Sequence, residues 1–153
     1  MSVVISFGRI LFALLFIVSG ASKLFDIAGT AQSIADHVIV PASLAGYVAD
    51  IEALTTISFS RILAIAAGAI EFVCGVLIAF NIGIRFFSSV LILFVLITIV
   101  YFHDFWNQTG ADSRMQMVAA LKNLSLIGAL LVLAGHGRAE QEALPPPRKY
   151  NEL

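Results

Sequence analysis

The stretch ILAIAAGAIEFVCGVLIAF, residues 62–80, decides the fold that this sequence predicts. It is long enough to cross a hydrocarbon core, because a spanning helix needs roughly 20 mostly apolar residues. Its one charged side chain is Glu71, nine residues from either end. At a rise of about 1.5 Å per residue, Glu71 lies more than ~10 Å from each end, too deep for its carboxylate to reach water. The stretch therefore predicts a membrane-spanning helix whose central carboxylate is either paired or protonated.

Three further apolar stretches of similar length flank this one, at residues 5–24, 86–105 and 117–134. The tight turn 81–84 joins two neighbouring stretches as an antiparallel hairpin. Apolar residues make up 59% of the chain and charged residues only 12%, about half the charge of a soluble domain. A water-soluble fold of 153 residues could not bury so much apolar surface. The sequence therefore predicts an all-α membrane protein, a bundle of four transmembrane helices.

The link between the first two spans, residues 25–60, is too long to be a simple loop. Ser43 is a suitable N-cap for a helix within it. In such a helix five apolar residues share one face, namely Leu44, Tyr47, Val48, Ile51 and Leu54. We expect this amphipathic helix to lie on the membrane surface or to cover the bundle. Residues 1–135 then form the transmembrane domain, and residues 136–153, with three consecutive prolines, form an extended polar tail.

The distribution of Lys and Arg predicts the orientation, because cytoplasmic ends of spans are richer in these residues. With four spans, both termini share a side with the turn at Gly83. That side carries five cations, Arg9, Arg85, Arg138, Arg148 and Lys149, against three on the other, Lys23, Arg61 and Arg114. We therefore expect both termini in the cytoplasm. The net charge of −1 provides no basic field for nucleic acid.

Two cations lie at a depth from which they could reach Glu71. Arg9 is four residues into the first span, and Lys122 is five residues into the fourth, from the opposite side. Together with Asn123 they predict an intramembrane charge network in which Glu71 pairs with Arg9 or Lys122. The network is either a structural ion pair that fixes helix register, which we favour, or part of a proton or quinone-headgroup site.

Small residues recur around Glu71 in the second span. Ala64, Gly68, Gly75 and Ala79 are spaced by four or seven residues, a pattern that lets helices approach closely in lipid. Gly20 in the first span and Gly128 in the fourth are the small residues expected to face them. We interpret this face as a packing surface and not as a binding site.

His103, Lys122 and Asn123 lie near the outer ends of their spans and could together contact a lipid-soluble headgroup. The three histidines do not fall at matching depths on facing spans, as a haem would need. A lone cysteine, Cys74, excludes an internal disulfide and a CxxC pair. Neither a catalytic triad nor a phosphate loop nor a metal-ligand spacing occurs, so the sequence contains no self-contained catalytic motif.

Several short motifs, taken in order, give the chain a family resemblance. They are Gly8-Arg9, Ser19-Gly20-Ala21-Ser22-Lys23-Leu24, Pro41, Glu71 with Gly75, Gly83 with Arg85, His103-Asp104-Phe105-Trp106 and Lys122-Asn123-Leu124. From about residue 7 to residue 135 the chain resembles the DoxX family of small bacterial membrane proteins. The resemblance singles out Arg9, Lys23, Glu71, Arg85, His103, Lys122 and Asn123, without giving them roles.

This resemblance implies a multi-pass protein of the bacterial inner membrane. The family is related to the membrane subunit of a thiosulfate:quinone oxidoreductase. The resemblance therefore implies that the protein is a subunit or accessory factor of a quinone-linked or thiol-stress redox system, with quinone as the candidate cofactor. Any enzymatic role would be that of an oxidoreductase subunit. The alternatives are a non-enzymatic scaffold of a larger complex and, less favoured, a small transporter. Partners beyond the lipid bilayer would be other subunits or further copies of the chain.

Overall fold

A computed structural model describes the backbone of residues 3–142 and the side chains of residues 3–135. In order, the elements are α1 (Val3–Phe25), α2 (Ile27–His37), the 3-10 turn η1 (Ala42–Leu44), α3 (Ala45–Thr55), α4 (Phe59–Ala79), α5 (Ile84–Phe102) and α6 (Gly110–Glu142). Four helices are long and apolar enough to cross a membrane: α1, α4, α5 and the Gly110–Gly135 part of α6. The described residues form no strand. The predicted all-α fold with four spans is confirmed.

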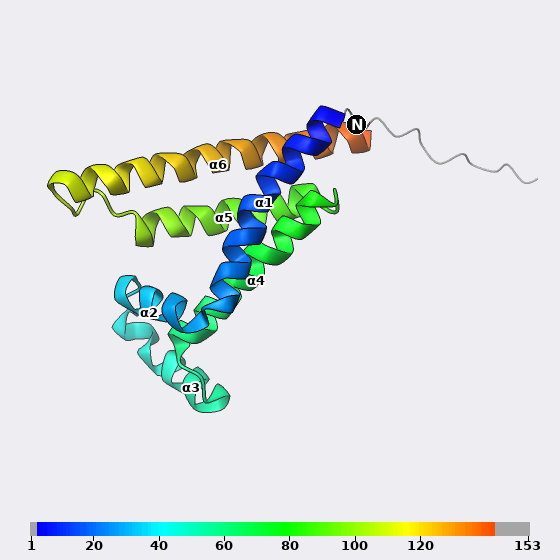
Figure 1. Ribbon diagram of the computed structural model, residues 1–153. Helices are drawn as coiled ribbons and strands as arrows, with labels where there is room; N and C mark the ends of the chain where they lie inside the picture. The colour runs from blue at the N-terminus through cyan, green and yellow to red at the C-terminus, as the bar shows by residue number, and fades with distance from the viewer. Residues whose placement is uncertain (1–2, 143–153) are drawn as a thin grey trace, which may run out of the picture.

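The four long helices form two antiparallel pairs, α1 with α4 and α5 with α6 (Figure 1). The pairs lie close together at the end that carries the N-terminus, where a short turn connects α4 to α5. They separate toward the other end, where α2 and α3 are attached below the α1–α4 pair (Figure 1). The cavity described below is lined by residues of both pairs.

Small residues bring α1 and α4 into backbone contact. A Cβ atom added to Gly20 would lie 2.5 Å from the Phe72 nitrogen and 2.7 Å from the Gly68 oxygen. Such distances are shorter than any real contact, so only glycine fits at this crossing. The predicted packing of Gly20 against the small-residue face of the second span is confirmed. The same role for Gly128 is wrong, because its surroundings are open and it is exposed on α6.

The core buried between the pairs is small and mostly apolar. Ile78, Leu91 and Leu130, from α4, α5 and α6, are fully buried and form the centre of the core. Large apolar side chains such as Phe7 and Leu93 remain well exposed. In water an apolar surface of this extent would drive association, but in a bilayer the lipid chains solvate it. The outward-facing apolar surface is therefore what a membrane-spanning bundle requires.

The helix predicted in the first link exists, but it starts later than expected and, of the two expected positions, it does not take the one that covers the bundle. Ser43 lies in the 3-10 turn and does not cap an α-helix, since α3 begins at Ala45 with Leu44 as its N-cap. No residue of α3 is buried. Its apolar residues, including Tyr47 and Leu54, are exposed, so α3 does not cover the bundle.

The helix that does cover the bundle is α2, which the sequence analysis did not identify. The Asp26 carboxylate caps α2 by accepting a hydrogen bond of 2.9 Å from the backbone N–H of Gly29. Ala31 and Ile34 are buried in a cluster with Ala64 of α4. The aromatic rings of His37 and Phe102 stack at 4.9 Å and hold the end of α2 against α5.

The spans differ from their predicted ranges mainly at the ends. Helix α5 ends at Phe102, where the chain leaves the helix at His103, and α6 begins at Gly110. Helix α6 also continues to Glu142, past the predicted start of the tail at residue 136. Residues 143–153, with the three prolines of the predicted extended tail, lie outside the described residues.

Candidate functional site

Glu71 is buried on α4, and its partner is Lys23 of α1. The Lys23 ammonium donates a hydrogen bond to Glu71 Oε2 at 2.6 Å and another to Ser19 Oγ at 2.7 Å. The Ser19 hydroxyl donates to the same Glu71 oxygen at 3.1 Å. The Glu71 side chain is 8% exposed and that of Lys23 30%. The second oxygen, Oε1, accepts no hydrogen bond from the described residues, which leaves it available to a ligand.

The predicted pairing of Glu71 with Arg9 or Lys122 is wrong. Arg9 donates from Nη1 to the Asn81 side-chain oxygen at 2.9 Å, in the turn between α4 and α5. Lys122 is exposed on α6 and forms no ion pair within the part of the chain that the structure describes.

The physical reason is the direction in which helical side chains point. Each Cα–Cβ bond tilts toward the N-terminus of its helix. Lys23, near the end of α1, therefore leans back into the membrane, and Glu71 on the antiparallel α4 leans toward it. The same tilt directs Arg9 away from Glu71, toward the end of the bundle where Asn81 lies. Depth along the helix alone could not distinguish these arrangements.

Lys23 and Ser19 are the site residues that the sequence analysis missed. The sequence analysis counted Lys23 only among the cations at the end of the first span, although the family resemblance singled it out. The signal that could have identified the pair was local. Ser19 and Lys23 are four residues apart and share a helix face, and Gly20 between them packs against Gly68, three residues before Glu71.

A cavity of about 440 Å³ lies beside the ion pair, between the two helix pairs. Its polar lining comes from all four spans and the end of α5, with Ser19, Lys23, Glu71, Thr98, His103, Lys122 and Asn123. Its apolar lining is Leu15, Phe16, Phe94, Val95 and Leu126. The three residues expected to form a headgroup site thus line one cavity, and Glu71 lines it too. What this cavity binds remains a prediction.

The matched family model decides the relationship of this chain to known proteins. A sequence model of DoxX matches residues 4–104, about two thirds of the chain. The chain belongs to the DoxX family. The match includes the Lys23–Glu71 pair and His103, whereas Lys122 and Asn123 on α6 lie beyond it. With its four apolar spans, this DoxX chain is an integral membrane protein.

One curated protein illustrates how far the similarity to DoxX relatives extends. The chain is 29% identical over 132 residues to the inner membrane protein YphA of Escherichia coli (strain K12). This similarity covers 86% of the chain and 81% of YphA. No solved structure matches the chain.

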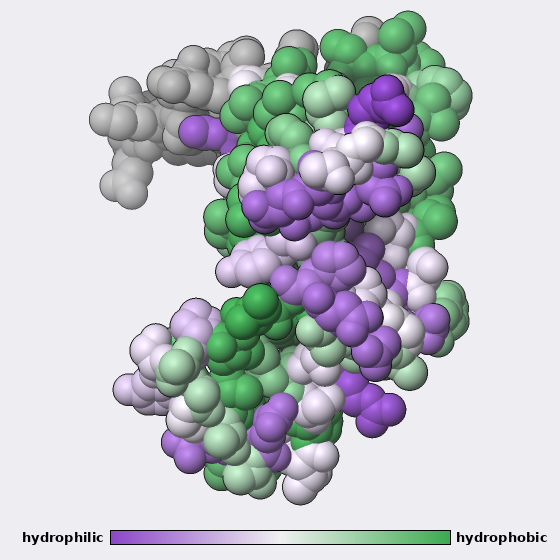
Figure 2. Space-filling view, turned by 90° about the vertical axis from the view of Figure 1, so that its left-hand side faces the viewer, coloured by the Kyte–Doolittle hydropathy of each residue, from purple (hydrophilic) through white to green (hydrophobic). Residues whose placement is uncertain are grey.

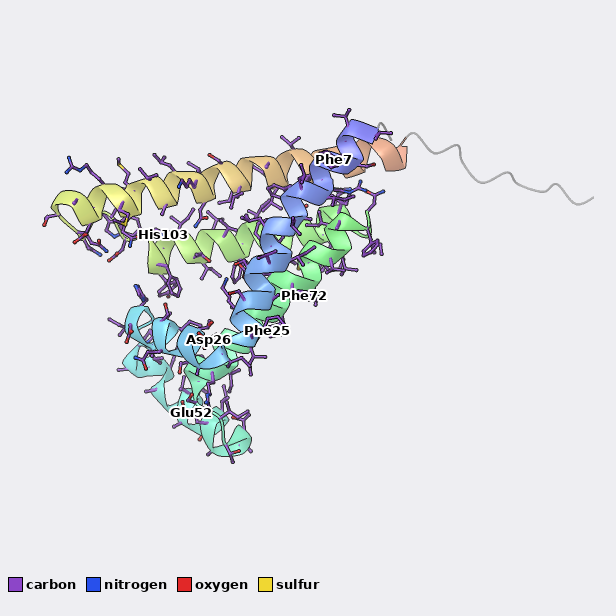
Figure 3. All side chains as sticks on the ribbon, in the orientation of Figure 1. Phe7, Phe25, Asp26, Glu52, Phe72 and His103 are labelled. Atoms are coloured by element: carbon purple, nitrogen blue, oxygen red, sulfur yellow. The ribbon has the colours of Figure 1, made fainter. Side chains whose placement is uncertain are left out.

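His103, at the end of α5, lines the 440 Å³ cavity and is held in place by a hydrogen bond. Its Nδ1 lies 2.8 Å from the side-chain oxygen Oε1 of Gln116 on α6. With an amide oxygen as partner, Nδ1 carries the proton, and Nε2 of the neutral ring is left as an acceptor. Figure 3 places His103 at the end of α5, beside α6. The ring therefore connects the end of α5 to α6 beside the cavity that it lines.

The molecule is polar where the two pairs separate. Figure 2 shows this end, and a band of hydrophilic residues crosses it at mid-height, with apolar residues above and below. Among the described residues, no group of three His, Cys, Asp or Glu side chains is placed to hold a metal ion. The chemistry that the site offers is hydrogen bonding and charge, next to an apolar wall.

Proposed function

We propose that this DoxX-family protein binds a quinone headgroup in the 440 Å³ cavity, as a subunit or accessory factor of a redox system in the bacterial inner membrane. The observation that carries the proposal is the lining of this cavity, where donors and acceptors from separate helices meet beside apolar side chains. Its volume lies within the roughly 300–1,000 Å³ of small-molecule sites.

The donor and acceptor set suits both redox forms of such a headgroup. The carbonyl oxygens of the oxidised form need donors, which the Lys122 ammonium and the Asn123 amide can supply. The hydroxyl groups of the reduced form need acceptors, which Glu71 Oε1 and His103 Nε2 can supply. A bound quinone would supply two-electron chemistry coupled to protons. The chain itself would orient the ring and hold protons at Glu71 and His103.

Replacing Lys122 tests the proposal directly. We expect Lys122→Ala to weaken the binding of decylubiquinone about tenfold, because a hydrogen bond to a charged group contributes roughly 1.5 kcal/mol or more. Binding is measured by quenching of Trp106, the single tryptophan, in protein purified in mild detergent. The matched control is Arg114→Ala, which removes an exposed α6 cation that does not line the cavity. Equal losses in both variants, or no binding by the unaltered protein, would contradict the proposal.

We further propose that the protein lies in the inner membrane with both termini in the cytoplasm. The inner-membrane relative and the excess of Lys and Arg at the end of the bundle with Arg9 and Arg85 support this orientation. A green fluorescent protein fused after residue 153 is expected to fluoresce, since it folds in the cytoplasm. Alkaline phosphatase inserted after Val40, in the link between α2 and α3, is expected to be active outside it. The reverse pair of results would overturn the orientation.

A scaffold function is the second candidate, and one observation favours it. The Lys23–Ser19–Glu71 hydrogen bonds join α1 to α4 next to the Gly20 crossing. This network could serve only to fix the register of the pair, within a complex that includes other subunits or copies of the chain. A scaffold predicts that quinone does not bind, so the Lys122 experiment separates the two candidates.

A further inference from the structure

A second cavity, of about 580 Å³, lies under α2, between the end of α1 and the helices α4 and α5. Its walls are mostly apolar, with Ile34, Leu63, Ile70, Ile97 and Phe102 among them. The stacked rings of His37 and Phe102 hold α2 over it. Neither the family resemblance nor the quinone proposal assigns a role to this space.

The two cavities adjoin at the ion pair. Lys23, Glu71, Phe94 and Thr98 line both of them. Three polar residues of the first cavity do not line the second, namely His103, Lys122 and Asn123. A molecule with its headgroup in the first cavity could therefore extend an apolar portion past Phe94 into the second.

We propose that the cavity under α2 holds the hydrocarbon tail of the molecule whose headgroup occupies the polar cavity. The ligand is thus an amphiphile with one ring-sized headgroup and a flexible apolar chain. This inference rests on the proposed function and specifies where the tail of its ligand lies.

The charges in the second cavity favour a tail over a separate phospholipid. Its charged residues are Lys23, Asp26 and Glu71. Lys23 is engaged by Glu71, and Asp26 caps α2 at Gly29. A phosphate headgroup needs a cation or several donors, and the described lining offers it no cation free of a carboxylate. Of the lining hydroxyls, those of Thr30 and Thr98 already donate to backbone carbonyl oxygens, which leaves Ser33 alone. An apolar chain has no such need.

The tail gains little from leaving lipid for this cavity, because lipid chains are already apolar. Its contribution comes from the fixed shape of the cavity, so filling the cavity is the decisive test. Ala67 and Ala66 of α4 line it, and larger side chains there would occupy its space. Val73, on the same helix, is exposed and lines neither cavity. Val73→Phe is therefore the matched control for Ala67→Phe.

The experiment compares decylubiquinone with its tail-free counterpart, 2,3-dimethoxy-5-methyl-1,4-benzoquinone, by Trp106 quenching. We expect Ala67→Phe to weaken decylubiquinone about tenfold and to leave the tail-free quinone within about twofold, which is under ~0.5 kcal/mol. Val73→Phe should change neither. Ala66→Leu, at an exposed position that tolerates added volume, gives the same comparison if Ala67→Phe does not fold.

The outcomes separate this inference from the proposed function. Unchanged decylubiquinone binding in variants that fold would overturn the tail site and leave the headgroup site intact. Equal weakening of both quinones would also overturn it, because the effect would then act on the headgroup. If the unaltered protein binds neither quinone, the proposed function fails and the tail site fails with it.

Discussion

Gly20→Val is expected to prevent the α1–α4 pair from forming and to reduce the yield of monodisperse protein about tenfold or more. The added Cβ would lie 2.5 Å from a backbone nitrogen of Phe72 and 2.7 Å from a backbone oxygen of Gly68. Backbone atoms cannot rotate away as side chains do, so the helices must separate. Overpacking typically costs about 1–3 kcal/mol. Here separation of the helices would also pull Lys23 from Glu71, so the cost lies at the upper end or beyond.

The measurement is size-exclusion chromatography and thermal unfolding in a mild detergent. Gly128→Val is the matched control, because it makes the same substitution at an exposed position of α6 with nothing within 4 Å of the new Cβ. Both variants replace Gly with the same residue, so any change in intrinsic helix propensity is similar in the two. Similar behaviour of the two variants would show that the Gly20 crossing is not what holds the pair together.

The transmembrane fold could be predicted from sequence because lipid imposes a length and a composition on each span. Residues 62–80, for example, correspond to α4 within three residues at either end. The small-residue face around Gly68 was predictable for the same reason, since close helix contact in lipid requires small side chains. The sequence could not tell which glycine packs against this face. Gly20 and Gly128 are both small, and only the packed structure distinguishes them.

The link between the first two spans was predicted less well. Its helices are short, and the thickness of the bilayer does not set their length. The sequence analysis followed the apolar residues from Leu44 to Leu54, but Ile27, Ala31 and Ile34 also share one helix face, and these are the residues that pack against α4. None of the residues of α3 is buried, so its apolar pattern does not mark a contact with the rest of the protein. The Asp26 cap, a local hydrogen bond to the backbone N–H of Gly29, was a second signal for α2.

The sequence could predict which residues line the candidate site, but not which of them form ion pairs or hydrogen bonds with one another. His103, Lys122, Asn123 and Glu71 do line one cavity, as intramembrane polar residues usually do when they face the bundle interior. The partner of Glu71 depended on side-chain direction and on the register of α1 against α4. Both are properties of the packed pair, so an argument from depth alone favoured Arg9 or Lys122 and overlooked Lys23.

Lys23→Met is expected to destabilise the protein more than Glu71→Gln, although both remove the same ion pair. Lys23→Met leaves the nearly buried Glu71 carboxylate without its cation, and removing one partner of a buried pair costs up to about 3–5 kcal/mol. Glu71→Gln leaves Lys23, which is 30% exposed and two residues from the end of α1. Its long side chain can reach the interface, so we expect a cost of about 1 kcal/mol.

The double variant, Lys23→Met with Glu71→Met, decides whether this pair is structural or functional. Replacing both partners with apolar side chains removes the buried charges altogether, which is often neutral for stability. We expect its unfolding temperature to lie closer to that of the unaltered protein than that of Lys23→Met does. If Glu71 Oε1 contacts the ligand, this well-folded variant will still bind decylubiquinone at least several-fold more weakly. Restored stability with full quinone binding would assign the pair to helix register alone, because the ligand would then be held by His103, Lys122 and Asn123.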